Sequence, residues 1–419
     1  MDISSLPDDV LRLVLKQATT SHYIPGVAQK ANLQLLAVCQ RWRDLALPIV
    51  YKKAFVRYGA VSFWGDYNVV ARELDGHLTA LYASQLEALR SQHSIKLPAD
   101  CVLGELRELK HDFNGLSPYM LPRADPAKLV KLHLSSWADN HFWAPLVGDD
   151  SPWDVLFPNM EELYVRYDGC RVRNDPQHPD GHPWKFHFPQ LKRLTIYAME
   201  KTCPLLEYAV LPASMDKITL GLHPSLFRSL LEMQLPATKR VEVGLRGRST
   251  GGPDMMAIVN RVLERVQGSE RTGLYVSNGS LVVPPEGITF TALTGLTVTA
   301  STSVDTIVGL IHRLPRLTSL KIGNITFDNV QTDISVPGPD EDCLVEPFDT
   351  RIGYMVLDTV SQNPIAETGT QAVKYLLLKT RTLTTLNARC FPEQPIAEFV
   401  AVYSTRYPHL ARARMYLSK

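Results

Sequence analysis

The sequence lacks three features that would each define a class of protein. No stretch approaches the roughly 18 to 20 uninterrupted apolar residues of a membrane-spanning helix. No two of its six cysteines have the Cys-x-x-Cys spacing of zinc ribbons and redox pairs. With 44 Lys and Arg against 43 Asp and Glu, the formal charge of +1 produces no global field toward nucleic acid or an anionic membrane. We therefore expect neither a membrane nor a nucleic acid among its partners.

The common catalytic motifs are also missing. The sequence contains no phosphate-binding Gly-x-x-x-x-Gly-Lys-Ser/Thr, no His-Glu-x-x-His and no Gly-x-Ser-x-Gly. This pattern favours a protein that is not an enzyme, and we expect no cofactor. An enzyme that uses its surface as a cleft stays an open alternative, although the sequence identifies no converging titratable groups.

The start of the chain gives an expectation about location. Residues 1–5 are acidic rather than basic, and no apolar run of a signal peptide follows them. The scattered cysteines are typical of reduced thiols. We therefore expect a cytoplasmic or nuclear protein.

What the sequence does contain is enough apolar material for a core. Of its 419 residues, 45% are hydrophobic and 21% charged, which is typical of a folded chain. This length suits two or three domains or one elongated repeat array.

The first fifty residues predict short helices. Pro7 suits a first turn, and Asp8 and Asp9 face the positive end of a helix dipole. Apolar residues then recur at helical spacing at Leu6, Val10, Leu13 and Val14. A second stretch runs from Ala31 to Ala46. Short helices are poorly stable alone, so we predict three of them packed together.

Two segments here carry a family resemblance. Residues 6–11 read Leu-Pro-Asp-Asp-Val-Leu, and residues 36–45 read Leu-Ala-Val-Cys-Gln-Arg-Trp-Arg-Asp-Leu. Together they resemble the F-box, with its Leu-Pro opening and Val-Cys-x-x-Trp-Arg-x-Leu close. In that family these helices bind a Skp-type adaptor, which links the protein to a cullin ubiquitin ligase (SCF). The loop at residues 18–30 is longer than the usual F-box connection.

The resemblance implies a set of adaptor-binding residues. The Leu-Pro segment and first helix supply direct contacts, and the second motif supplies positions that are shared core or contact residues. The implied residues are Leu6, Pro7, Val10, Leu11, Leu36, Val38 and Trp42. A well-capped helix start and a core aromatic would be the plainer interpretation of the same residues.

A short phrase repeats through the rest of the chain. It reads Phe-Pro-x-x-x-x-Leu-x-apolar at residues 157–165 and Phe-Pro-x-x-x-x-Leu-x-apolar again at residues 188–196, with a related form at 314–322. Weaker copies include residues 103–109, 293–298 and 383–386. The leucine and the apolar residue two positions later point to one face of a short strand.

The spacing of the phrases indicates a repeat protein. Equivalent positions are 31 residues apart at Leu163 and Leu194, 23 apart at Ile218 and Val241, and 24 apart at Leu296 and Leu320. Helix-like fillers at 224–231 and 253–266 alternate with the phrases. The pattern resembles degenerate leucine-rich repeats, which implies an α/β solenoid with parallel strands on a concave face and helices or loops outside. A compact α/β domain is the alternative.

These patterns divide the chain into three parts. We expect an F-box-like helical module at residues 1–55, a helical linker or cap at 56–100, and the solenoid at 101–419. The helical linker rests on leucines at helical spacing between Val69 and Arg90. The solenoid would present its strand face to a partner.

Three polar clusters are candidates for further chemistry. The glycine-rich stretch 244–252 could hold a phosphate at a helix start, but an ordinary repeat loop is the preferred interpretation. A metal site at His178, His182 and His187 with Cys170 and Cys203 is weighed against an exposed proline-rich loop. The acidic segment 337–342 could contact a basic partner, but a solvated surface loop is the preferred interpretation.

The function expected from the resemblances is that of a substrate-recognition adaptor. The helical module would dock the Skp-type adaptor, and the repeat surface would hold a protein to be ubiquitinated. The rival is a non-catalytic repeat scaffold whose N-terminal helices only cap the solenoid.

Overall fold

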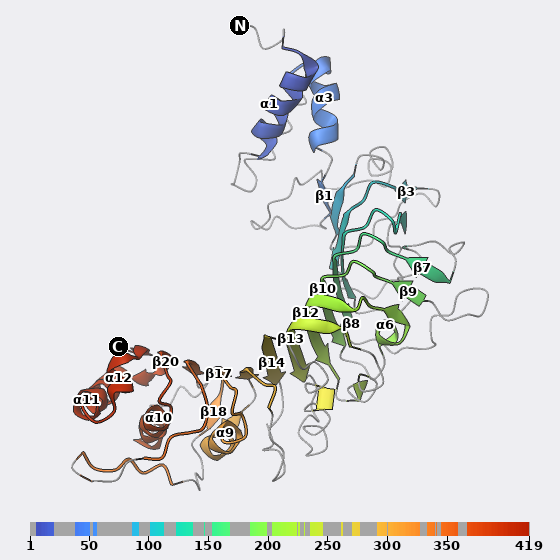
Figure 1. Cartoon of the computed structure of the whole chain (residues 1–419). Coiled ribbons are helices and arrows are strands. Elements are labelled where there is room, and N and C mark those ends of the chain that lie inside the picture. Colours follow the sequence, from blue (N-terminus) through green and yellow to red (C-terminus); the bar gives the residue numbers. More distant parts are fainter. Residues whose placement is uncertain are drawn as a thin grey trace. The chain divides into compact units, whose positions relative to one another are not determined.

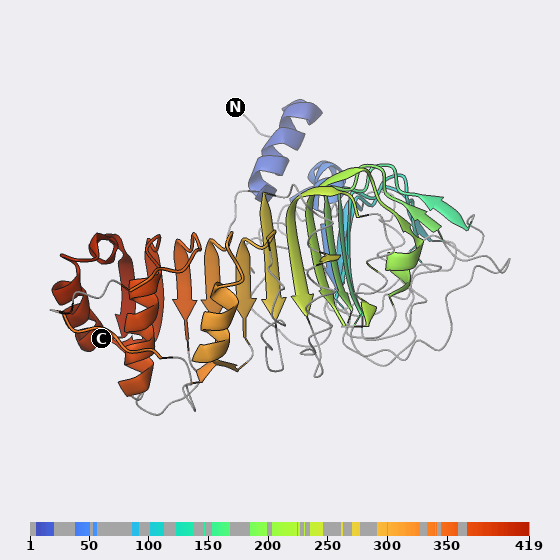
Figure 2. The same ribbon diagram turned by 60° about the horizontal axis from the view of Figure 1, so that its bottom comes forward.

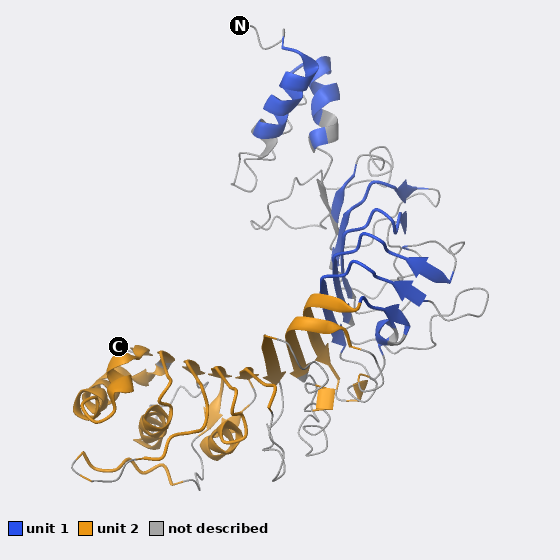
Figure 3. Cartoon of the chain, viewed as in Figure 1, with its two compact units in different colours: residues 1–212 blue, residues 213–419 orange. Residues whose placement is uncertain are grey.

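The computed structural model describes most of the repeat strands and two N-terminal helices. The described residues are 6–20, 38–50, 53–56, 86–91, 101–112, 123–136, 146, 153–167, 185–198, 203–223, 225–226, 230, 235–245, 261–262, 270–276, 291–299, 301–326, 333–339, 341, 345–358 and 367–418. The chain forms two compact units, residues 1–212 and 213–419 (Figure 3). Each unit contains its own series of parallel strands.

Unit 1 begins with two helices, α1 (Asp8–Thr20) and α3 (Gln40–Val50). Pro7 precedes α1, and its carbonyl accepts a hydrogen bond from the backbone N–H of Leu11. Asp8 and Asp9 occupy the first turn, where carboxylates are favoured by the helix dipole. The helix predicted at the Leu-Pro segment is therefore confirmed. The middle of the predicted three-helix module lies outside the described residues.

The main sheet of unit 1 has six described strands, all parallel, in the order β1-β2-β4-β6-β8-β10 (Figure 1). They are β1 (Lys53–Val56), β2 (Ala88–Ser91), β4 (Glu108–Asp112), β6 (Lys131–Ser136), β8 (Glu162–Tyr167) and β10 (Arg193–Ala198). Shorter elements lie along one side of these strands in Figure 1: β3 (Val102–Leu103), β5 (Arg123–Ala124), β7 (Asp154–Leu156), β9 (Lys185–His187), α6 (Pro204–Tyr208) and β11 (Ala209–Val210).

Unit 2 continues the same construction with eight described parallel strands. They are β12 (Ser214–Leu222), β13 (Ala237–Leu245), β14 (Arg271–Val276), β15 (Gly295–Val298), β17 (Ser319–Ile322), β19 (Tyr354–Leu357), β20 (Thr385–Pro392) and β21 (Arg414–Ser418). Between them lie β16 (Thr302–Ser303), α9 (Val304–Ile311), β18 (Ile325–Thr326), α10 (Glu367–Lys379), α11 (Glu393–Tyr403) and α12 (Pro408–Arg412). Helices α9, α10 and α11 cover one side of this sheet (Figures 1 and 2).

The repeated phrase places its leucines in register on neighbouring strands. In unit 1 the ladder is Leu89, Leu109, Leu132, Leu163 and Leu194, all buried. The predicted equivalences Leu163 with Leu194, Ile218 with Val241, and Leu296 with Leu320 are each direct pairs in the sheet. This arrangement is an α/β fold with a long parallel sheet, consistent with a leucine-rich-repeat-like solenoid.

Side chains at several strand entrances tie one repeat to the next. In unit 2, the Thr318 hydroxyl donates to the Thr294 carbonyl at 2.9 Å, and the Thr294 hydroxyl donates to the Thr272 carbonyl at 3.1 Å. In unit 1, the Asn159 amide donates to the Ala127 carbonyl at 2.6 Å. These bonds satisfy backbone acceptors at turns where the sheet ladder begins.

The aromatic residue of the Phe-Pro phrase supplies the core of unit 1. Phe157 and Phe188 are fully buried with their ring centroids 5.2 Å apart, and Phe186 of β9 lies 6.2 Å from Phe157. Phe157 and Phe188 directly follow the short strands β7 and β9, whereas the leucine of each phrase joins the main sheet. The same phrase therefore serves both layers.

The structure corrects the sequence prediction at residues 88–90. The leucines up to Arg90 have helical spacing, but Ala88–Ser91 form strand β2, paired with β1 and β4. Leu89 joins the buried leucine ladder, so pairing with neighbouring strands decides its conformation. Residues 57–85 lie outside the described residues. Strand β1 also starts the sheet before residue 101.

Of the two helix-like fillers, only a few residues are described. Leu226, Leu230, Arg261 and Val262 are helical, as predicted, and the rest of both stretches lie outside the described residues. Within the described residues, no helix is long and apolar enough to cross a membrane.

Candidate protein-interaction surfaces

The two N-terminal helices pack through one narrow apolar seam. Leu11 and Leu15 of α1 contact Leu45 and Ala46 of α3, and all four are buried. Trp42 and Ile49 pack against this cluster and are partly buried. The seam therefore uses Leu11 and Trp42 as core residues of the helical pair.

An ion pair joins the two helices at one end. The Arg41 guanidinium donates to the Asp8 carboxylate from Nε at 3.0 Å and from Nη2 at 2.6 Å. Arg41 Nη2 also donates to the Leu6 carbonyl at 2.6 Å. The Leu6-Pro7 segment is thereby fixed against α3, 35 residues further along the chain.

A second apolar stripe of α1 stays open to solvent. Val10 is 41% exposed, Leu13 66% and Val14 41%, and Val38 just before α3 is 57% exposed. Pro7 is exposed and Leu6 is half-buried. The helical spacing predicted the stripe of Leu6, Val10, Leu13 and Val14 correctly, but the intramolecular core uses Leu11 and Leu15 instead. Leu36, also implied by the resemblance, lies outside the described residues.

The outward face of the unit 1 sheet carries an alternating row of charges at the strand starts. Glu108, Lys131, Glu162 and Arg193 are in-register neighbours on β4, β6, β8 and β10. Lys131 and Glu108 are 2.7 Å apart, as are Arg193 and Glu162. The hydrogen bond to Glu108 holds the pKa of Lys131 above its usual value. These charges neutralise one another.

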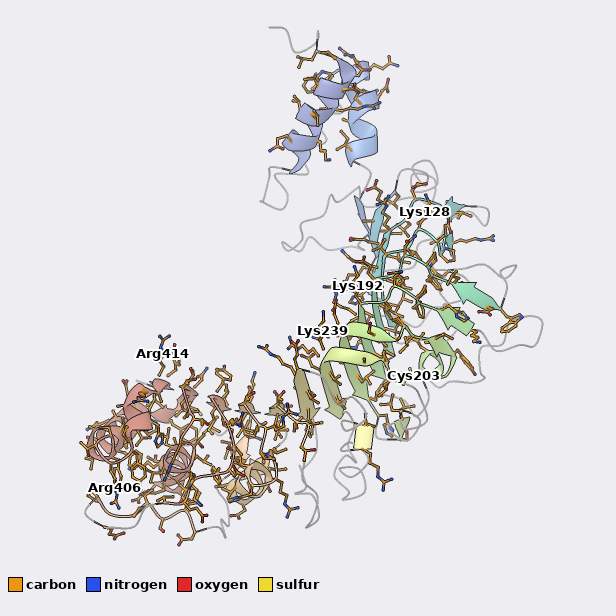
Figure 4. All side chains as sticks on the ribbon, in the orientation of Figure 1. Lys128, Lys192, Cys203, Lys239, Arg406 and Arg414 are labelled. Carbon is orange, nitrogen blue, oxygen red and sulfur yellow. The ribbon has the colours of Figure 1, made fainter. Side chains whose placement is uncertain are left out.

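Further pairs continue this pattern outside the strands. Lys192 lies 2.7 Å from Glu161, and Lys128 lies 3.4 Å from Glu105 (Figure 4). Exposed pairs of this kind contribute about 0 to 1 kcal/mol each. Their main effect is that the charges of each pair offset one another.

Next to the charged row lies a row of aromatic rings. His133 and Tyr164 are in-register neighbours whose rings stack at 3.7 Å between centroids with planes 14° apart. Tyr197, one step diagonal on β10, meets Tyr164 edge-on at 5.7 Å. Aromatic side chains held rigidly on a sheet are the type enriched in protein interfaces. This row is the strongest candidate for partner binding on the sheet of unit 1.

The strand face of unit 2 is polar with separate tyrosines. Glu242 of β13 lies 2.9 Å from Lys217 and 2.6 Å from Arg240, and it accepts a hydrogen bond from Thr219 at 3.2 Å. Burial acts to raise the pKa of Glu242, but the hydrogen bond and charge of Lys217, the charge of Arg240 and the Thr219 hydrogen bond outweigh it, so its pKa is lowered.

Tyrosines extend from three strands of unit 2 at outward positions. Tyr275, Tyr354 and Tyr416 are each more than one-third exposed. The Tyr275 ring lies close to Gly244, its in-register neighbour on β13. A Cβ atom added at Gly244 would be 3.8 Å from this ring. These rings offer contact area of the kind that protein partners bury.

The other polar clusters predicted from the sequence have mixed outcomes. His187 contacts Asp154 at 2.5 Å, and Cys203 is buried at the start of α6. His178, His182 and Cys170 lie outside the described residues, and among the described residues no group of His, Cys, Asp and Glu could hold a metal ion. Most of the glycine-rich stretch 244–252 is likewise not described. In the acidic segment, the Pro337 carbonyl accepts a hydrogen bond from Tyr403 of α11, and the Glu341 carbonyl accepts one from Arg406 in the turn after α11.

No protein-family model matches this chain, and no curated protein matches it.

Proposed function

We propose that this chain is the substrate-recognition adaptor of an SCF-type (Skp–cullin–F-box) ubiquitin ligase. In this proposal the pair α1 and α3 docks a Skp-type adaptor, and the repeat surface holds the target protein. The proposal combines the F-box-like motifs with one structural observation, which is the open apolar stripe of α1.

The stripe supports the proposal because it is separate from the seam that holds the helices together. Leu11 and Leu15 already fill the contact with α3, so Val10, Leu13 and Val14 are not needed for it. Covering a half-exposed aliphatic side chain is worth about 1 kcal/mol, so the three together favour a partner. Aliphatic side chains grouped on one exposed helix face are typical of an interaction site.

The Leu6-Pro7 segment lies beside this stripe in the sequence, and Arg41 holds it. A segment that is already fixed loses little conformational freedom when a partner binds. This supports a direct contact at Leu6, Pro7 and Val10, with Leu11 and Trp42 acting through the core that shapes the helices.

The repeat units would supply the second half of the function. The stacked His133, Tyr164 and Tyr197 rings offer a rigid aromatic patch to a target protein. The chain itself would carry no catalytic residue and use no cofactor. Holding the target beside a charged conjugating enzyme raises the local concentration of the reacting groups, and this proximity is the whole mechanism.

A pull-down of the purified full chain with a Skp-type adaptor tests this proposal. We compare the wild type with Val10→Ser/Leu13→Ser, which alters only exposed side chains, and with Leu6→Ala/Pro7→Ala. The matched control is Arg12→Ser/Asp44→Ser, which alters exposed polar residues on the same two helices. Circular dichroism checks that every variant is folded.

The proposal expects the wild type and the control to retain the adaptor, and both apolar variants to lose it. If the folded wild type fails to bind, the F-box assignment is rejected and the chain is a repeat scaffold. Equal binding by all four proteins would reject the stripe as the docking site.

A further inference from the structure

Unit 2 contains a groove on the side of its helices. Its volume is about 1020 Å³, and it is formed by three segments that are distant in the sequence: residues 333–339, α10 and α11. It is built only from residues of unit 2, none of which belongs to the N-terminal helices assigned to the Skp-type adaptor.

The groove has one polar wall and two walls on which apolar side chains stand beside polar ones, Glu398 on α11 and Asp333 and Ser335 on the extended segment. Helix α11 contributes Pro395, Phe399, Val402 and Tyr403 at helical spacing, and residues 333–339 add Ile334, Val336 and Pro339. Helix α10 contributes Glu367, Thr368, Gln371 and Lys374 from one of its faces. An occupant therefore meets apolar carbon beside carboxylates on two walls and hydrogen-bonding groups on the third.

Hydrogen bonds hold the extended wall in place. The Tyr403 hydroxyl donates to the Pro337 carbonyl at 2.5 Å, and the Arg406 guanidinium donates to the Glu341 carbonyl (Figure 4). The Glu341 backbone N–H donates to the Gly338 carbonyl at 3.1 Å. A groove with fixed walls binds without first paying the entropy of ordering them.

The charges at the groove are mainly negative. Among the described residues, Asp333, Glu367 and Glu398 line it, against one cation, Lys374. The ammonium of Lys374 is 5.7 Å from the centre of the Phe399 ring, so it also interacts with the apolar wall. The Ser335 hydroxyl and backbone N–H donate to Asp333 and lower its pKa, which keeps this carboxylate ionised.

This charge and the open walls define the class of occupant. Carboxylates repel the phosphates of nucleic acids and anionic lipids. Small-molecule sites bury most of the ligand, whereas Val402 is 52% exposed and Glu367 and Glu398 lie at the surface. An extended peptide fits better, because its alternate side chains can face opposite walls.

We propose that this groove docks an extended segment of a partner protein that carries basic side chains alternating with aliphatic ones. The aliphatic side chains pack on Val402, Val336 and Pro339. The basic side chains pair with Glu367 and Glu398. This site is additional to the Skp-type docking stripe and does not depend on it.

Selection from a displayed library of random decapeptides on the full-length chain tests the proposal. Enriched peptides are synthesised with a fluorescent label, and their affinities are measured by fluorescence anisotropy. The test variants are Glu367→Lys/Glu398→Lys, and Val402→Ser, which alters one exposed side chain. The charge-matched control, Glu346→Lys/Asp349→Lys, reverses two exposed carboxylates of unit 2 outside the groove.

We expect enriched peptides with basic and aliphatic residues in alternation. The double charge reversal should weaken them about tenfold, which is the sum of two exposed ion pairs at about 0.7 kcal/mol each. Val402→Ser should also weaken them, and the control should bind like the wild type. The proposal is overturned if no peptide is enriched, if the enriched peptides lack basic residues, or if the groove variants bind them as tightly as the control does.

Discussion

Arg41 of α3 donates two hydrogen bonds to the carboxylate of Asp8 at the start of α1, across 33 residues of sequence. A third bond from the same guanidinium reaches the Leu6 carbonyl. One side chain therefore fixes both the first turn of α1 and the Leu-Pro segment that precedes it. Both partners are exposed, so the pair orients the segment more than it stabilises the fold.

Breaking this pair should have a small effect on stability. We expect Arg41→Met to destabilise the helical pair by about 0.5 to 1 kcal/mol, since two hydrogen bonds to Asp8 are lost at an exposed site. Asp8→Asn should cost a similar amount. A double-mutant cycle, measured by hydrogen exchange of the α1 amides, gives the interaction free energy between Arg41 and Asp8. Strictly additive single effects would show that the two side chains do not interact.

Two leucines of α1 provide a matched test of the seam. Leu11 is fully buried and Leu13 is 66% exposed, although they are two residues apart on one helix. Leu11→Ala should destabilise the helical pair by about 2 to 4 kcal/mol, because it opens a cavity against α3. Leu13→Ala should change it by less than about 0.5 kcal/mol. Native-state hydrogen exchange of α1 measures both, and equal effects would refute the assignment of the seam.

The phenylalanine core of unit 1 can be tested with adjacent residues. Phe157→Ala should lower the free energy of unfolding of unit 1 by about 3 to 5 kcal/mol, because a fully buried ring is removed from its contacts with Phe186 and Phe188. Leu156, the preceding residue, is exposed, so Leu156→Ala is the control. Urea titration followed by circular dichroism measures the midpoints. A midpoint unchanged by Phe157→Ala would contradict this packing.

Glu242 should make unit 2 sensitive to acid. Its pKa in the folded state is lowered below the usual 4.5, so it stabilises the fold above that pH, and the contribution is lost as the pH falls through the folded-state pKa. Glu242→Gln should therefore be less stable than the wild type at pH 7, with the difference shrinking below pH 4.5. Urea midpoints at several pH values measure this.

The control for this experiment is Glu270→Gln, at an exposed residue next to β14. It should follow the wild type at each pH. A wild-type advantage over Glu242→Gln that stays constant from pH 7 to pH 3 would contradict the assigned pKa direction.

Many strand positions could be predicted because the repeated phrase contains apolar residues that alternate along a strand and so face the core. Leu163 and Val165 alternate toward the core, and the same alternation recurs at Leu194 and Ile196 in register. The repeated phrase does not predict strands β14 and β19, because no Leu-Pro or Phe-Pro pair directly precedes them in the sequence. The alternation of Leu274 and Val276, both buried, was the available signal.

Other features depend on contacts that no local pattern contains. Leu89 has an apolar neighbour at helical spacing, Leu86, and only pairing with β1 and β4 makes β2 a strand. Helix α1 has aliphatic residues on two faces, so periodicity alone does not tell whether Leu11 or Leu13 meets α3. The groove of unit 2 combines segments more than 60 residues apart, as the bond from Tyr403 to Pro337 shows.

Hydrogen exchange of α1 in the full chain, with and without a purified Skp-type adaptor, tests the central claim most directly. The account predicts slower exchange of the amides of residues 8–20 when the adaptor is added, and the slowing should disappear in Val10→Ser/Leu13→Ser but persist in Arg12→Ser/Asp44→Ser. Unchanged exchange in α1 at a saturating adaptor concentration would contradict it.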